Sequence, residues 1–339
     1  MKIEITNSPD IKQWSEFVYN HPQGNIFQTP EMVDVYKRTK NYEPICLAVV
    51  DSSDEILVVL VAVVIKEVGG IVGSFSAHLR INQGPLFLED ERGIEAAKVL
   101  MEYYEKIARK KALYTEVRSI RNTSEFSNLF NGLGYEYEER LNFLINLNRP
   151  EEEIWRNIHK SRRKGINRAK KKGIIIEKIE DKEDISSFYD IVAGTYKRVS
   201  VPLADYSFFE AMFELLVQKN MADFYFAKYN GESVGARVVL KYKDSIYDWY
   251  AGSLPTDEPL YVNEALVWYI LKAGANNGYH VFDFGGAGKP NEEYGVREFK
   301  RRFGGDLVNF GRYKKIHSPI KLKIAEKGFG IYKKISSII

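Results

Sequence analysis

The hydrophobic pattern of this chain predicts strands and helices in an order that occurs twice. In the first half, the strand-like runs CLAVV and ILVVLVAVVIKE and a segment ending in INQGPLF precede a helical run, IEAAKVLMEYYEKIARKK, and a strand, LYTEVRS. In the second half, FYFAKY, SVGARVVLKY and SIYDWYAGSLP precede the helical run NEALVWYILKAGANNG and the strand YHVFDFGG. Two copies of a hairpin, a strand, a helix and a strand predict a duplicated α+β unit.

The helices in this pattern follow from apolar side chains spaced three and four residues apart. One such face consists of Ala265, Trp268, Leu271 and Ala275. Asn230-Gly231 joins two strand-like runs, and a type I′ turn needs positive φ at both positions, so this pair predicts a hairpin. The run Ile56–Ile65 is β-branched and about half the ~20 residues that span a bilayer, so we interpret it as a buried strand.

Length and composition favour a soluble protein of two domains. The 339 residues exceed one ordinary core, and we predict domains at 1–148 and 149–339. The only cysteine, Cys46, lies in the apolar run ICLAVV, which favours a core position and a reducing compartment. The polar start MKIEITNSPD does not resemble a secretory signal, so the sequence predicts a cytoplasmic protein.

Basic residues are concentrated in two segments, although the net charge is only +3. Residues 151–172 predict a basic linking helix, with Glu151–Glu153 in its first turn and Gly173 just past its end. Arg162 falls within the apolar stripe of that helix and therefore needs an anionic partner, either an internal acid or a ligand phosphate. The basic tail, residues 317–339, predicts either a packed terminal helix or contact with an anionic membrane.

Several kinds of chemistry are excluded by missing motifs. The letters DFG at Asp283–Gly285 do not indicate a kinase, because no HRD loop occurs. No phosphate-binding loop of the GxxxxGK[ST] or GxGxxG type opens a helix. The five histidines are isolated, so we predict no metal site. A GxSxG nucleophile motif is also missing.

The segment after FDFGG remains as the candidate for chemistry. A helical wheel from Glu292 to Phe303 places Val296, Phe299 and Phe303 on one face, with Lys300 at its edge. A lysine at such an edge buries its stem and presents its ammonium at a boundary. The pattern therefore fits a positive charge directed into a cleft, and it fits a surface ion pair equally well.

The run GYHVFDFGGAG…YGVREFKRRFGGDLVNFGRY resembles the signature of the Fem family of peptidoglycan-bridge aminoacyltransferases. FQTPEM, INQGPLF, RAKKKGI and TYKRVSVPLADYSFF also resemble segments of that family. The likeness covers most of the chain, without a long coiled-coil arm. It departs from the family at Met32, where a tryptophan is usual, and at Leu88 or Glu89, where an aspartate often stands.

The resemblance implies two tandem domains of the GCN5-related N-acetyltransferase (GNAT) fold, each a mixed twisted sheet flanked by helices. It implies acyl transfer to an amine, with aminoacyl-tRNA as donor, no permanently bound cofactor, and a nucleotide- or lipid-linked cell-envelope precursor as acceptor. Phe299 and Lys300 match the family's Phe-Lys pair near the transferred acyl group. The substrate-binding positions that we carry over or infer are Arg198, Lys37, Arg162, Tyr206, Gly285 and Gly286.

Acyl transfer needs a deprotonated amine, proximity and stabilisation of the developing oxyanion. We expect a splayed strand edge to supply backbone N–H groups, Lys300 to supply positive charge and Phe299 to shape the acyl pocket. Asp283 is a candidate base or a loop cap. An acyl-CoA-dependent transferase acting on a polysaccharide or amino-sugar precursor is the alternative. However, GSLPTDEPLYVNEA lacks the glycines of a pyrophosphate-binding turn and carries two acids. A non-catalytic binding module of the same fold is a further alternative.

Overall fold

The computed structural model describes residues 2–66, 77–122 and 124–325. The chain divides into two compact units, which are treated separately below. The first unit comprises Met1–Glu138 with Phe310–Ile339, and the second comprises Glu139–Asn309. This division differs from the boundary drawn at residue 148, because the chain returns to the first unit after Asn309. Most of the basic tail, residues 326–339, lies outside the described residues.

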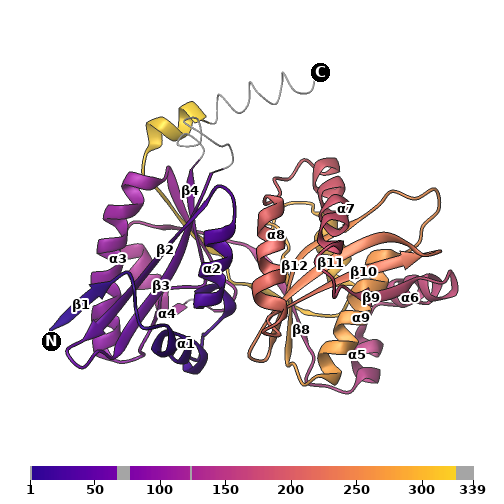
Figure 1. Ribbon diagram of the computed structural model, residues 1–339, viewed down its shortest axis with the longest axis horizontal. Coiled ribbons are helices and arrows are strands. Elements are labelled where there is room, and N and C mark those ends of the chain that lie inside the picture. The colour runs from indigo at the N-terminus through magenta and orange to yellow at the C-terminus, as the bar shows by residue number, and fades with distance from the viewer. Residues whose placement is uncertain (1, 67–76, 123, 326–339) are drawn as a thin grey trace. The chain divides into compact units, whose positions relative to one another are not determined.

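The first unit is a mixed sheet with helices on both faces (Figure 1). Its strands follow the order β1-β2-β3-β4-β6-β15-β7, with β5 beside β3. The strands are β1 (Ile3–Thr6), β2 (Tyr42–Asp51), β3 (Ile56–Ile65), β4 (His78–Asn82), β5 (Leu86–Phe87), β6 (Tyr114–Arg118), β7 (Glu136–Glu138) and β15 (Arg312–Ile316). The helices are α1 (Ile11–Asn20), η1 (Ile26–Gln28), α2 (Pro30–Arg38), α3 (Glu91–Lys111) and α4 (Ser124–Gly132).

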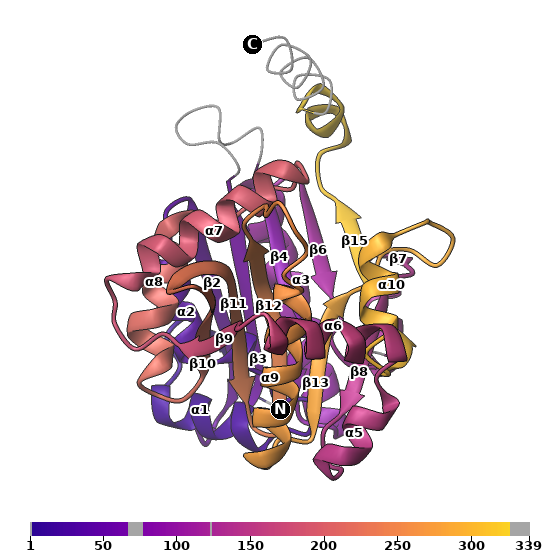
Figure 2. The same cartoon turned by 90° about the vertical axis from the view of Figure 1, so that its right-hand side faces the viewer.

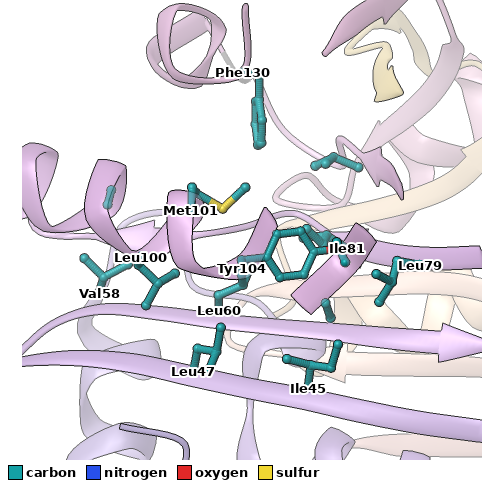
Figure 3. Close-up of a cluster of buried hydrophobic side chains, with 14 of the residues drawn as sticks. Ile45, Leu47, Val58, Leu60, Leu79, Ile81, Leu100, Met101, Tyr104 and Phe130 are labelled. Atoms are coloured by element: carbon teal, nitrogen blue, oxygen red, sulfur yellow. The ribbon is translucent and has the colours of Figure 1, made fainter. Parts of the chain in front are cut away.

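The core of the first unit lies between α3 and one face of the sheet. Leu100, Met101 and Tyr104 of α3 are fully buried, and Leu100 and Tyr104 point toward apolar residues of the strands beneath (Figure 3). Every residue of β3 is buried, because α1 and α2 cover the sheet face opposite α3 (Figure 1). The prediction of a buried strand at Ile56–Ile65 is therefore confirmed.

The second unit contains a sheet in the order β14-β8-β13-β12-β11-β10-β9. Its strands are β8 (Leu141–Asn146), β9 (Ile175–Lys178), β10 (Ala222–Tyr229), β11 (Glu232–Tyr242), β12 (Ser245–Ser253), β13 (Val281–Gly286) and β14 (Asp306–Asn309). Its helices are α5 (Glu151–Asn157), α6 (Lys160–Lys171), α7 (Asp184–Arg198), α8 (Tyr206–Met212), the π-helical turn η3 (Phe213–Val217), α9 (Val262–Asn276) and α10 (Gly295–Arg301).

Alternate residues of β10 pack against different helices, as the two-residue period of a strand requires. The Phe224 ring packs on Phe188 of α7, whereas the next residue, Tyr225, packs on Tyr269 of α9. Asn230 and Gly231 both have positive φ, 50° and 85°, so the predicted hairpin turn between β10 and β11 is confirmed.

The two units repeat one topology, which confirms the predicted duplication. In the first unit, the hairpin β2–β3 is followed by β4, α3 and β6, and β4 pairs with β6 in parallel. In the second unit, the hairpin β10–β11 is followed by β12, α9 and β13, and β12 pairs with β13 in parallel. A helix connects each parallel pair, because parallel strands need a crossover.

The strand that completes each sheet comes from a distant part of the sequence. After β7, the chain continues into β8, which pairs with β13 and β14 of the second unit. After β14 it continues into β15, which pairs with β6 and β7 of the first unit. Neither β8 nor β15 was among the predicted strands, and the strands that they pair with include β13 and β6, which are far away along the chain.

The predicted single helix at 151–172 is divided into α5 and α6. Ile158 adopts an extended conformation and is buried, which ends α5. The His159 side chain then accepts a hydrogen bond from the Ser161 N–H and caps α6. The predicted C-cap is confirmed, because Gly173 has φ +85° and its N–H bonds the Lys170 carbonyl.

Candidate functional site

The parallel strands β12 and β13 of the second unit separate part-way along their length. Their pairing begins at Ser245 with Val281 and ends at Tyr247 with Asp283. Beyond that point β12 continues alongside β11 as far as Ser253, and in the part of the chain that the structure describes no strand pairs with its other edge from Asp248 onwards. The register with β11 shifts between Val238 and Val239, which leaves an extra residue, Trp249, as a bulge where the strands part. The splayed strand edge expected from the resemblance is present.

Backbone groups face the open edge of β12. At its end, the N–H and the carbonyl of Ser253 both bond to the Thr195 hydroxyl of α7, at 2.9 and 3.1 Å. Alternate residues of a strand direct both backbone groups to the same side. Ala251, two residues earlier, therefore presents its N–H and carbonyl to the same open edge. Gly252 lies between them and permits α7 to pass closely, since a Cβ there would lie 2.7 Å from the Ile191 carbonyl oxygen.

Lys300 lies at the other side of this opening. Its ammonium donates hydrogen bonds to three consecutive carbonyl oxygens, those of Phe284, Gly285 and Gly286, at 2.5, 3.1 and 3.0 Å. An ammonium has three donors, so all three are used. Burial lowers the pKa of Lys300 to about 8, partly offset by the negative charges of Asp248 and Asp283. Lys300 therefore holds the end of β13, starting one residue after its pairing with β12 ends.

Asp283 is buried at that last paired position. Its Oδ1 accepts hydrogen bonds from the Asn142 amide and the Gly285 N–H, both at 2.7 Å. Gly285 has φ +70°, a conformation that a side chain would strain. Asp283 thus caps the turn that leads β13 away from β12. Burial raises the pKa of its carboxyl, against the effect of these two hydrogen bonds and of the Lys300 charge.

A buried ion pair beside the opening was missed by our reading of the sequence. The Arg237 guanidinium of β11 donates to both carboxylate oxygens of Asp248, at 2.7 and 2.6 Å. The exposed fractions of the two side chains are 5% and 11%. A signal was available, because each is a charged residue within a strand-like run of apolar and aromatic residues. Asp248 lies where β12 and β13 part, and its charge raises the pKa of Lys300.

Phe299 and Arg162 form the wall next to Lys300. The Phe299 ring contacts Phe284 and Phe303, with centroids 6.4 and 5.2 Å apart. The Arg162 guanidinium lies 4.3 Å above the Phe299 ring and donates to Glu264 at 2.7 Å. Of the two partners considered for Arg162, the structure places an internal acid beside it. Val296, which the helical wheel grouped with Phe299 and Phe303, is 42% exposed, whereas Phe303 is fully buried.

The start of α9 is occupied by side chains of α6, which runs across α9 (Figure 2). Besides Arg162 with Glu264, the Lys172 ammonium pairs with Glu258 at 2.5 Å and the Arg168 guanidinium donates to the Tyr261 hydroxyl at 2.7 Å. Gly165 allows this close approach, since its nearest neighbours are side-chain atoms of Tyr261 and Glu264. Basic residues of α6 therefore meet acids of the loop and helix start.

The remaining predicted residues have other partners. Arg198 ends α7 and donates to the Ser253 carbonyl at 2.5 Å, beside the end of the open edge. Tyr206 begins α8 and packs edge-on against Tyr189. Lys37 belongs to the first unit, where it is exposed and pairs with Asp34. Cys46 is half-buried in β2, and burial raises the pKa of its thiol to about 12, so it is poorly suited as a nucleophile.

Residues 2–66, 77–122 and 124–325 contain neither a candidate metal cluster nor a helix that could cross a membrane. In that part of the chain, no cluster of three or more His, Cys, Asp or Glu side chains could hold a metal ion. No helix there is both long and apolar enough to cross a membrane.

A family model now connects this geometry with known proteins. Residues 156–301, which include α6, the open strand edge and Lys300, match the model of the acetyltransferase (GNAT) domain. This region is similar to a GNAT acetyltransferase domain. The prediction that the chain is an acyltransferase is confirmed by this match, although the match names neither donor nor acceptor. The search of curated proteins found no match.

Solved structures of low sequence identity share the whole two-unit fold. FemX aligns with a TM-score of 0.72 at 16% identity, over 96% of this chain and 100% of that chain. A tandem GNAT protein from the clavulanic acid biosynthesis pathway aligns with a TM-score of 0.62 at 10% identity, over 94% and 99%. L-PGS from Bacillus licheniformis aligns with a TM-score of 0.59 at 15% identity, over 95% and 98%. The fold predicted from the resemblance, two tandem GNAT-like domains, is confirmed.

Proposed function

We propose that the GNAT domain transfers an aminoacyl group to an amine at the opening between β12 and β13. The observation that carries this proposal is the set of three hydrogen bonds from Lys300 to the carbonyls of Phe284, Gly285 and Gly286. These bonds hold the backbone from Phe284 to Gly286, just beyond the last pair between β12 and β13. The open backbone edge at Ala251 is then available to a donor.

The reaction follows from the groups at the opening. The acceptor nitrogen attacks the donor carbonyl carbon, a C–N bond forms, and the ester bond to the leaving hydroxyl breaks. The Ala251 N–H donates to the oxyanion that develops on the carbonyl, and Lys300 adds positive charge nearby. The nitrogen loses one proton, and the leaving oxygen gains one. Asp283 fits the role of a positioning residue better than that of a general base, because its Oδ1 already accepts two hydrogen bonds.

Aminoacyl-tRNA is our preferred donor over acyl-CoA. The start of α9, where backbone N–H groups and the helix dipole could hold a pyrophosphate, carries Glu264 and lies next to Glu258. Both acids pair with basic residues of α6 or its C-cap, so these side chains already occupy the place that a pyrophosphate would need. The exposed lysines of the same helix, Lys160, Lys164, Lys170 and Lys171, suit an RNA backbone.

A nucleotide- or lipid-linked cell-envelope precursor is the proposed acceptor. The resemblance to the Fem family and the fold shared with FemX and L-PGS support this assignment. Arg198 and Lys37, carried over from the resemblance, and Tyr206 are the proposed acceptor contacts. A cytoplasmic protein at the inner face of the membrane would meet such an acceptor. Membrane contact through the tail is part of this proposal, and most of that tail lies outside the described residues.

Binding measurements with two donors test the proposal. Charged tRNA should bind saturably and deliver its aminoacyl group to a muropeptide precursor, whereas acetyl-CoA should not bind. Saturable acetyl-CoA binding with acetyl transfer to an amino sugar would replace the preferred donor with the alternative. Binding of a precursor without transfer from either donor would instead favour a binding module of the same fold.

A further inference from the structure

Exposed aliphatic side chains lie at the end of the open strand edge in the second unit. In the loop that joins α7 to α8, Val199 and Val201 are 61% and 50% exposed. Leu254, the residue after β12, is 41% exposed. Arg198 donates to the Ser253 carbonyl at 2.5 Å, and this bond brings Leu254 close to the loop. We call Val199, Val201 and Leu254 the apolar rim.

The backbone at the end of α7 leaves these valines exposed. The Ser200 N–H bonds the Lys197 carbonyl at 3.2 Å, and the Val201 N–H bonds the Tyr196 carbonyl at 3.1 Å. This pair of bonds is a Schellman motif, which usually has glycine at its left-handed position and often packs the residue after that position on the helix. Here Ser200 takes the left-handed position, with φ 54°, and Val201 is half exposed. The loop therefore presents to solvent an aliphatic side chain that this motif often buries.

Two cations adjoin the apolar rim. Lys197 and Arg198 end α7, and both are exposed. In the described part of the chain, neither forms an ion pair with a carboxylate. The Arg198 guanidinium donates to the Thr195 hydroxyl and the Ser253 carbonyl, which are neutral acceptors. Asp257, in the loop after β12, is exposed and pairs with neither cation. Aliphatic side chains and positive charge without an acidic partner therefore occur together beside the opening.

This combination matches a phosphate joined to a hydrocarbon chain. Guanidinium and ammonium groups bind phosphate oxygens. Exposed aliphatic side chains gain free energy when a hydrocarbon chain covers them, and grouped ones mark binding surfaces. A nucleotide offers similar phosphates, but its base stacks on aromatic rings, whereas the rim is aliphatic. The rim also adjoins the strand edge at which we place acyl transfer, so a ligand bound there would reach the opening.

We propose that the apolar rim binds the hydrocarbon chain of a lipid-linked acceptor, while Lys197 and Arg198 hold its phosphates. This inference rests on the acyl transfer proposed above, and it selects the lipid-linked acceptor over the nucleotide-linked one. The cations and the aliphatic side chains act on two parts of one molecule, where its polar head meets its chain.

Co-sedimentation of the full chain with vesicles tests this inference without requiring transfer. Phosphatidylcholine vesicles that carry a polyprenyl diphosphate are compared with vesicles that carry phosphatidylglycerol at the same total charge. The wild-type chain should bind the polyprenyl diphosphate vesicles more tightly, and added salt should weaken this binding, since exposed charges are screened. The basic tail meets the same charge on both kinds of vesicle, so its charge does not produce the difference.

Two variants decide whether the binding uses the apolar rim. Val199→Ser, Val201→Ser and Leu254→Ser combined should weaken binding to the polyprenyl diphosphate vesicles by about tenfold or more, because three aliphatic contacts are lost. These side chains are exposed, so the fold should tolerate the change, and a thermal unfolding curve checks this. Ile175→Ser is the matched control, because Ile175 is 59% exposed on the edge strand β9, and it should leave affinity unchanged.

Transfer assays separate failure of this inference from failure of the proposed function. The same muropeptide is offered as a nucleotide-linked and as a polyprenyl-linked acceptor. In wild type, kcat/KM should be higher for the polyprenyl-linked form, and the triple variant should reduce this preference by about tenfold. A preference for the nucleotide-linked form, or equal vesicle binding by wild type and the triple variant, would overturn the inference. Transfer to neither acceptor would contradict the proposed function, and the vesicle comparison would still decide whether the rim binds lipid.

Discussion

The Lys300 ammonium donates a 2.5 Å hydrogen bond to the carbonyl of Phe284, the first residue of β13 beyond its pairing with β12. Two further bonds to Gly285 and Gly286 extend this contact along the strand end. Lys300 therefore acts first on the backbone of its own domain. The same contacts fix the position of the ammonium charge that we propose acts on the acyl donor. One side chain therefore both supports the strand end and supplies the positive charge at the opening.

Replacing Lys300 tests this double role. Lys300→Met keeps the apolar stem but removes all three hydrogen-bond donors. The end of β13 then loses its three side-chain hydrogen bonds, and the opening loses the ammonium charge. We expect kcat/KM for acyl transfer to fall by about 10²-fold or more, the usual loss when one stabilising donor is removed. Steady-state assays with circular dichroism as a folding check measure this. Full activity of Lys300→Met would contradict the role that we assign to Lys300 in acyl transfer.

The pH dependence of transfer shows whether the reaction requires Lys300 as a charged ammonium or as a neutral amine. Burial lowers the pKa of Lys300 from 10.5 to about 8, so the ammonium is lost as pH rises through that value. If the ammonium is required, kcat/KM should decline above about pH 8. Lys300→Arg should remove this decline, because a guanidinium stays protonated. A rate that instead rises through pH 8 in wild type, and no longer does so in Lys300→Arg, would mark the neutral amine as proton acceptor and contradict our reading.

Removing one partner of the Arg237–Asp248 ion pair should destabilise the fold more than replacing both partners with apolar residues. Asp248→Asn leaves a buried guanidinium without its counter-charge, and we expect a loss of about 3–5 kcal/mol in the free energy of unfolding. Combining Arg237→Met with Asp248→Leu should recover most of that loss, because no charge is then buried. Urea denaturation of the two variants and wild type measures both. A single variant as stable as wild type would show that the pair contributes little.

Gly252 tests the close approach of α7 to β12. A Cβ at Gly252 would lie 2.7 Å from backbone atoms of Ile191 and Val192, which cannot move aside as a flexible side chain could. Gly252→Ala should therefore cost about 1–3 kcal/mol. Gly295→Ala is the matched control, since a methyl group there meets nothing within 4 Å. Equal melting temperatures for the two variants would contradict this packing.

Part of the candidate site was predictable, but most of the partners of its residues were not. The resemblance directed attention to Phe299, Lys300 and the strand before them, and the structure brings these together at the opening. Lys300 was expected at the edge of an apolar stripe with either a cleft or an ion pair beside it. Its partners are backbone carbonyls, which every residue carries, so no residue type in the sequence could reveal them.

Local periodicity determined the elements of this protein. The buried strand at Ile56–Ile65, the Asn230-Gly231 turn and α9 follow from patterns within a few residues, because strand alternation, helical spacing and positive φ act over that range. The repeated order of those elements was enough to predict two similar units. Tertiary structure decided what the elements meet: the break at Ile158, the return of β15 to the first sheet, and the Arg237–Asp248 pair. These features depend on packing and strand edges supplied by distant parts of the chain, which no local pattern contains.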